Sequence, residues 1–120
     1  MIDLEKLERK ILDDYCIEGG LRPSIEVTSD NDVEVKLSVN FIRYTKSRNK
    51  FSSGEVEIEY YIWMNINVST NEIMDIGTNA DDRGLIDEDD YDIDDRYCVL
   101  VYHVYERMMD DVETGIFTID

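Results

Sequence analysis

Two stretches of strict two-residue alternation constrain this chain more than any other feature of its sequence. Apolar side chains occupy every second position from Val33 to Phe41 and again from Val56 to Val68. Such alternation is typical of strands with one buried face, because successive side chains of a strand point to opposite sides. The connection between the two stretches is polar and ends in Ser-Ser-Gly. We therefore predict a long antiparallel hairpin formed by residues 33–44 and 55–68.

The N-terminal segment has helical rather than alternating spacing. Leu4, Leu7, Ile11 and Tyr15 recur at intervals of three and four residues, with charged residues between them. Asp3 is placed to cap such a helix, and a Gly-Gly pair at 19–20 is placed to end it. We predict a helix over residues 3–17.

Several shorter segments complete the predicted sheet. Residues 25–27, 72–77 and 114–119 read as strands, and residues 29–32 as a turn. The segment 97–107 is rich in β-branched and aromatic residues, which favours a strand; a helix over 96–109 is the alternative. The prediction is a single α+β domain over residues 1–120, with the N-terminal helix packed on an antiparallel sheet of five to six strands.

Net charge limits the partners that the chain can have. There are 29 acidic residues against 12 basic ones, a net charge of −17. Such a surface repels nucleic acid and membranes and attracts cationic proteins. No apolar run reaches the ~20 residues of a membrane span, and the charged N-terminus lacks the apolar stretch of a signal peptide. We expect a cytoplasmic protein with reduced, buried cysteines at positions 16 and 98.

The acidic residues are most concentrated in the segment 81–95, named here the acidic tract. It contains nine acids and one base, Arg83, and so carries about half of the net charge. Ile86, Tyr91 and Ile93 are apolar residues that could anchor it to the protein or to a partner. A solvated loop, part of an acidic connection over 78–95, is the alternative. We predict that the partner binds here through Asp87, Glu88, Asp89, Asp90, Tyr91, Asp92, Asp94 and Asp95.

A second candidate surface lies on the polar face of the hairpin. If the alternating apolar residues face the core, Tyr61 and Trp63 point the other way, beside a row formed by Glu55, Glu57 and Glu59. Aromatic anchors with a charged rim are the common plan of protein interfaces. Carboxylates at every second position are ~6.5–7 Å apart, a spacing close to that of nucleic-acid phosphates. The alternative is that a helix or loop covers the aromatic residues as a second core layer.

Motifs that would indicate catalysis are missing or incomplete. The single histidine, His103, falls in an apolar pattern and is expected in the core or half-buried. Glu34-x-Lys36 matches part of a nuclease signature, and Asn79 begins a partial calcium loop in which Arg83 occupies a ligand position. No phosphate-binding glycine loop or zinc motif occurs. We expect no enzymatic activity, no cofactor and no metal, with a metal-dependent nuclease as the minor alternative.

In length, acidity and absence of catalytic motifs, the chain resembles the small acidic phage proteins that inhibit host defence, including anti-CRISPR proteins and other DNA mimics. The resemblance is one of size and composition, and it carries no motif residues. It implies a basic groove of a nucleic-acid-binding protein as the partner, for example that of a Cas nuclease, and the host cytoplasm as the location if a phage encodes the chain. An immunity protein that neutralises a basic toxin is the alternative.

Overall fold

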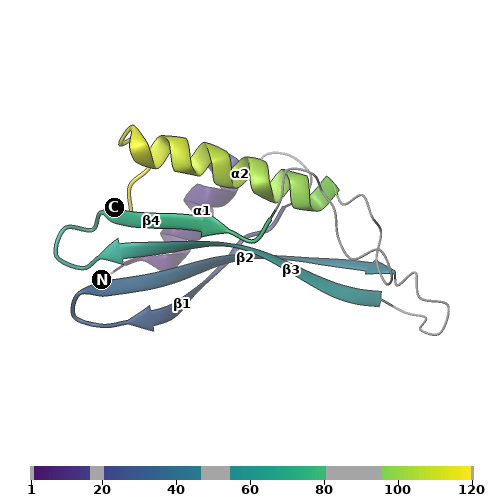
Figure 1. Cartoon of the computed structure of the whole chain (residues 1–120), viewed down its shortest axis with the longest axis horizontal. Helices are drawn as coiled ribbons and strands as arrows, with labels where there is room; N and C mark the ends of the chain where they lie inside the picture. The colour runs from purple at the N-terminus through teal and green to yellow at the C-terminus, as the bar shows by residue number, and fades with distance from the viewer. Residues whose placement is uncertain (1, 17–20, 47–54, 81–95, 120) are drawn as a thin grey trace.

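The computed structural model describes residues 2–16, 21–46, 55–80 and 96–119, with side chains described at all of these except 43–46, 55–58 and 96. Within these ranges the chain forms four strands and two helices (Figure 1). In chain order the elements are α1 (Leu4–Tyr15), β1 (Ser24–Asp30), β2 (Glu34–Lys46), β3 (Glu55–Asn67), β4 (Ile73–Thr78) and α2 (Arg96–Glu113).

The four strands form one antiparallel sheet in the order β1-β2-β3-β4. The predicted hairpin is confirmed: β2 pairs with β3 from Glu34↔Asn67 to Lys46↔Glu55. Asparagine side chains build both described turns. Asn31 Oδ1 accepts hydrogen bonds from the backbone N–H groups of Val33 and Glu34, at 2.9 and 2.8 Å. Asn67 Oδ1 accepts in the same way from Ser69, at 2.8 Å. Each side chain replaces a backbone acceptor and so fixes the turn.

Both helices lie on the same face of the sheet, above and behind it in Figure 1, and the core lies between them and the strands. The alternating residues predicted to face the core do so, because Leu37, Val39 and Phe41 of β2 are fully buried. The rest of the buried core comes from β3, both helices, the segment that follows α1 and the C-terminal segment: Leu7, Ile11, Tyr15, Cys16, Leu21, Tyr60, Ile62, Met64, Ile66, Cys98, Val101, Val104, Met108, Phe117 and Ile119.

Helix α1 begins as predicted. The Asp3 side chain caps it by accepting a hydrogen bond from the Lys6 backbone N–H at 3.1 Å. The helix ends at Tyr15, two residues before the predicted end, and Cys16 caps it by donating its backbone N–H to the Ile11 carbonyl. The glycines at 19–20 lie outside the described residues.

The prediction of a strand over 97–107 is wrong, and the alternative of a helix is correct. Residues 96–113 form α2, with Cys98, Val101, Val104 and Met108 buried along one side. Their spacing of three and four residues is that of a helix face. The β-branched and aromatic composition raised strand propensity, but a propensity is a weak prior that burial against the sheet overrides.

The predicted final strand over 114–119 is also wrong. Gly115 ends α2 with a φ of 78°, a conformation that glycine adopts without steric cost. The chain then turns back, and the Phe117 N–H donates to the Asp111 carbonyl at 3.0 Å. The described residues thus contain a four-stranded sheet, not one of five to six strands. The predicted strand over 97–107 is part of helix α2, and the predicted strand over 114–119 is an irregular segment, named here the C-terminal tail.

This tail fastens the end of α1 to α2. The Phe117 ring meets Tyr15 edge-on at 5.7 Å, and Lys10 Nζ lies 4.8 Å from the centre of the same ring. The Tyr15 hydroxyl donates to Asp111 Oδ2 at 2.6 Å. Burial and this hydrogen bond to a carboxylate both raise the pKa of Tyr15. Burial likewise raises the pKa of the neighbouring Cys16 thiol to about 11, against a smaller lowering by Arg107.

Candidate partner-binding site

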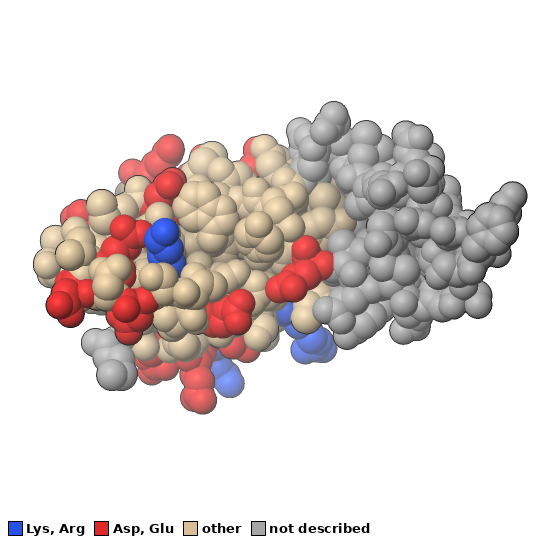
Figure 2. All heavy atoms as spheres, turned by 60° about the horizontal axis from the view of Figure 1, so that its bottom comes forward, with Lys and Arg blue, Asp and Glu red and all other residues tan. Residues whose placement is uncertain are grey.

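Because both described helices take one face of the sheet, the other face, named here the outer face, is left without a helix layer. Figure 2, which turns the lower side of Figure 1 toward the viewer, shows uncharged side chains gathered across its middle, with a basic side chain beside them and acidic ones mainly along the margin. Strand register places the outward-facing residues in rows across the sheet. One row runs through all four strands: Glu26, Ser38, Trp63 and Gly77.

Trp63 lies at the centre of the outer face and rests on Gly77. A Cβ atom at Gly77 would lie 2.3 Å from Trp63 Cζ2 and 2.4 Å from Trp63 Cε2. The indole therefore leans over β4 and occupies the space that a side chain at position 77 would need. The contact leaves Trp63 half-buried by the sheet itself. A glycine in a strand often marks such a close approach.

A shallow cleft of about 460 Å³ runs along β2 beside this indole; it is named here the outer cleft. Its floor is formed by Ser38 and Asn40 of β2. Glu59, Tyr61 and Trp63 of β3 form one side, and Glu26 and Thr28 of β1 form the other. The two sides stand on strands separated by two strand spacings, or roughly 9–10 Å between backbones.

The hydroxyl groups of the outer cleft donate their hydrogens within the protein. Ser38 Oγ donates to Asn40 Oδ1 at 2.7 Å, and Thr28 Oγ1 donates to the Lys36 carbonyl at 3.2 Å. Each hydroxyl has one hydrogen and two lone pairs, so both retain only acceptor capacity toward the cleft. Together with the Glu26 and Glu59 carboxylates, they make its lining rich in acceptors.

The end of β4 holds the aromatic strand in place. Asn79 Oδ1 accepts from the Tyr61 N–H at 2.8 Å, and Asn79 Nδ2 donates to the Glu59 carbonyl at 3.2 Å. Thr78 Oγ1 donates to the Tyr61 carbonyl at 2.8 Å. These bonds use both polar ends of the Asn79 amide, which the sequence had placed first in a partial calcium loop. The loop positions from 81 onward lie outside the described residues.

The structure brings together three of the predicted site residues, Glu59, Tyr61 and Trp63, on the outer face. The alternative in which a helix covers Trp63 is not found among the described helices. The backbones of Glu55 and Glu57 belong to β3, but their side chains lie outside the described residues. So do all predicted residues of the acidic tract: Asp87, Glu88, Asp89, Asp90, Tyr91, Asp92, Asp94 and Asp95.

Sequence reasoning missed the other side and the floor of the outer cleft. Glu26 stands between Ile25 and Val27, and Ser38 and Asn40 stand at the polar positions of the β2 alternation. The signal was present in that alternation. The alternation does not give the register between the strands, and it is the pairs Glu26↔Ser38 and Ser38↔Trp63 that bring these residues to one place.

The described residues offer no support for metal chemistry. No group of three or more His, Cys, Asp or Glu side chains able to hold a metal occurs within the described ranges. Glu34 and Lys36 lie on β2 opposite Asn67 and Asn65. His103 is exposed on α2, so the prediction that it is in the core or half-buried was wrong; the helical period puts it on the solvent side.

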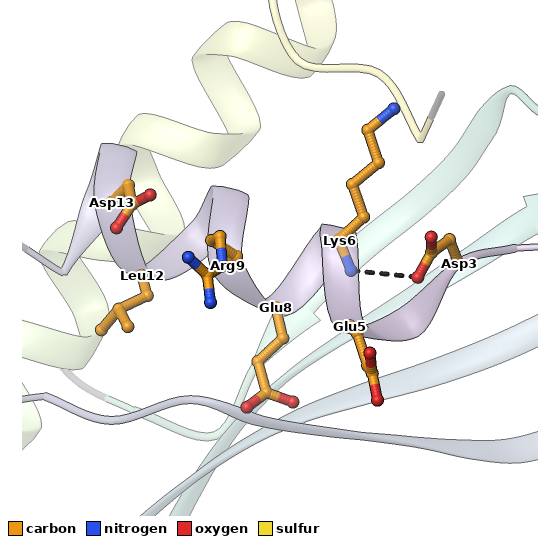
Figure 3. Close-up of a pocket in the computed structure, with 7 residues that line it drawn as sticks. All are labelled: Asp3, Glu5, Lys6, Glu8, Arg9, Leu12 and Asp13. Atoms are coloured by element: carbon orange, nitrogen blue, oxygen red, sulfur yellow. Dashed lines mark hydrogen bonds between the residues drawn. The ribbon is translucent and has the colours of Figure 1, made fainter.

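Two further hollows lack the features of a binding site. One, of about 700 Å³, lies along α1 and is lined by that helix and its cap alone, so it has no second wall; Figure 3 shows Lys6 pointing away from Glu5 and Glu8. The other, of about 430 Å³, lies beside the start of α1 and is mainly aliphatic, with Val27 and Val68 in its lining. It has no aromatic anchor.

Comparison with protein-family models, with curated proteins and with solved structures found no match to this chain. The function of the chain is therefore inferred from its sequence, its fold and the outer cleft. Neither helix in the described part of the chain has the length and apolar character needed to cross a membrane.

Proposed function

We propose that this protein is a non-catalytic acidic binding protein that inhibits a nucleic-acid-binding enzyme by occupying the enzyme's basic groove, as an anti-CRISPR or DNA-mimic protein does. The observation that carries the proposal is the outer face. Trp63 and Tyr61 stand there beside the Glu26 and Glu59 carboxylates, on the side of the sheet that both described helices leave open.

Physical chemistry favours a cationic protein as the partner. Carboxylates accept charge-assisted hydrogen bonds from Arg and Lys, as phosphates do. Aromatic side chains such as the half-buried Trp63 and the exposed Tyr61 supply the anchors on which interface affinity mostly depends once a partner desolvates them. The net charge of −17 accelerates encounter with a basic surface and opposes binding to nucleic acid itself. The acidic tract, with nine acids and one base, contributes to this long-range attraction in the proposal.

An affinity experiment tests the proposal. The protein is immobilised, exposed to a host lysate at low salt, and eluted with rising salt or with competing DNA. Three variants accompany the wild type. The first changes the outer face by Glu26→Gln, Glu59→Gln and Tyr61→Ala. The second removes the same number of charges from α1 by Glu5→Gln and Glu8→Gln. The third neutralises part of the acidic tract at Asp87, Glu88, Asp89, Asp90 and Asp92.

We expect the immobilised wild type and the immobilised α1 variant to retain one nucleic-acid-binding enzyme, which both salt and DNA release. The outer-face variant should retain much less of it. Recovery of a toxin instead would favour the immunity protein. Equal recovery by the outer-face variant and the wild type would contradict a role for the outer face, and the tract variant then shows whether the acidic tract binds alone.

A further inference from the structure

The outer cleft has a shape and a chemistry that select among cations. Its β3 side presents two rings at positions 61 and 63, ~6.5–7 Å apart along one strand, and its floor is formed by the small side chains of Ser38 and Asn40. The Trp63 indole is held in position because Gly77 lies beneath it. The two aromatic residues thus border the floor on its β3 side, where a flat group can contact them.

The two carboxylates and the internal hydrogen bonds of the outer cleft favour a cationic ligand that donates. Ser38 and Thr28 have already given their hydrogens to Asn40 Oδ1 and the Lys36 carbonyl. With Glu26 and Glu59, four acceptor groups come from three strands. A phosphate or carboxylate could accept from the Asn40 amide or the aromatic N–H and O–H groups, but it would meet the like charge of Glu26 and Glu59. A guanidinium offers five donors and carries the opposite charge.

Arginine fits this arrangement better than lysine. The guanidinium is planar, is more weakly hydrated than an ammonium, and stacks on aromatic rings while it donates in its own plane. Lysine carries a compact, strongly hydrated charge that neutralises the carboxylates but uses the aromatic side less well. Lys36 lies on the same face of β2 as Ser38, but it is not among the residues that line the outer cleft.

We propose that the outer cleft receives an arginine side chain of the partner, stacked against Trp63 and Tyr61 and hydrogen-bonded to Glu26 and Glu59, and that it discriminates against lysine. This inference rests on the proposed function, since it names the group of the basic partner that the outer face recognises.

Two labelled peptides of equal length and charge test the inference, one with six arginines and one with six lysines, each spaced by glycine. Binding to the full chain is measured by fluorescence anisotropy at ~150 mM salt, where the general attraction is screened. Trp63 is the only tryptophan, so its emission, measured with unlabelled peptide, reports whether the outer cleft is filled. We expect the arginine peptide to bind about fivefold to tenfold more tightly and to change this emission more.

Variants locate the selectivity. Trp63→Leu should bring the ratio of the two affinities to below about twofold. Glu26→Gln with Glu59→Gln should weaken the arginine peptide more than the lysine peptide. Glu5→Gln with Glu8→Gln removes the same charge from α1 and should weaken both peptides equally. Circular dichroism checks folding, and the glutamine variants keep the test valid if Trp63→Leu does not fold.

Equal affinity of wild type for the two peptides would overturn the inference, as would selectivity that survives both outer-cleft variants. If both peptides bind equally and salt releases both, the proposed function keeps its support and only the arginine cleft is wrong. If neither peptide binds even at ~20 mM salt, where screening is weak, the inference and the proposed basic partner fail together.

Discussion

The contact between Trp63 and Gly77 decides the shape of the outer face at the level of single residues. A glycine in a strand ordinarily weakens it, because it has no side chain to pack. Here the indole of the neighbouring strand covers the glycine, an arrangement known to compensate for glycine in sheets. The same contact holds the aromatic side of the outer cleft, so the stability of β4 and the geometry of the outer cleft depend on one pair.

Gly77→Ala should therefore destabilise the protein by about 1–3 kcal/mol, because the new Cβ forces the indole out of its place. Chemical denaturation measures the loss. The cost should fall below about 1 kcal/mol when Trp63 is first replaced by Val, since the clash is then gone. A cost that is the same in both backgrounds would show that the indole is not the cause.

Cys16 predicts a dependence of stability on alkaline pH. Burial raises the pKa of its thiol from the ordinary 9.0 to about 11 in the folded protein, so the folded state favours the neutral form. That contribution is complete below pH 9 and is lost as pH rises through about 11. The stability advantage of wild type over Cys16→Ala should shrink between these values. The comparison leaves Tyr15 unchanged in both proteins, and an advantage that does not vary with pH would contradict the burial of the thiol.

At the scale of elements, the sequence predicted the parts whose pattern and local chemistry agreed. The alternation of β2 and β3 fixed both their existence and their buried face, and Asp3 fixed the start of α1. For α2 the two signals disagreed. Val99, Val101 and Val104 favoured a strand by composition, while the spacing from Cys98 to Met108 favoured a helix. Only packing against the sheet resolves such a conflict, and the same holds for the cross-strand register that assembles the outer cleft.

A matched pair of substitutions distinguishes helix from strand at α2. Val101 is fully buried and Val99 is half-buried. In the helix they face different directions, whereas in a strand they would share one face. Val101→Ala should cost about 2 kcal/mol of unfolding free energy, and Val99→Ala less than about 1 kcal/mol because the gain in helix propensity offsets lost contacts. Equal costs in urea denaturation would favour the strand.

At the scale of the whole molecule, the two faces of the sheet differ in what they carry. One face holds the helices and the core, so the opposite face is free to carry aromatic and acidic side chains without loss of packing. The net charge of −17 destabilises the folded state, because its many acidic side chains repel one another. In the proposed complex, the positive charge of the partner relieves that repulsion.

Salt should therefore stabilise the free protein. Raising NaCl from ~20 mM to ~500 mM shortens the Debye length from about 20 Å to about 4 Å and screens most of the repulsion. We expect the thermal midpoint to rise by several degrees, measured by circular dichroism. Near pH 4.2, the isoelectric point of the sequence, the rise should be much smaller. A midpoint that falls with salt at pH 7 would mean that attractive ion pairs outweigh the net repulsion.

Hydroxyl-radical footprinting of the complex with the recovered nucleic-acid-binding protein tests the central claim most directly. Trp63 and Tyr61 report on the outer face, and Met74, which is 62% exposed at the β4 edge beside α2, serves as the internal reference. The account predicts that the partner protects Trp63 and Tyr61 from oxidation several-fold while Met74 reacts as in the free protein. Unchanged oxidation of Trp63 and Tyr61, with protection of Met74 instead, would place the partner elsewhere and contradict the account.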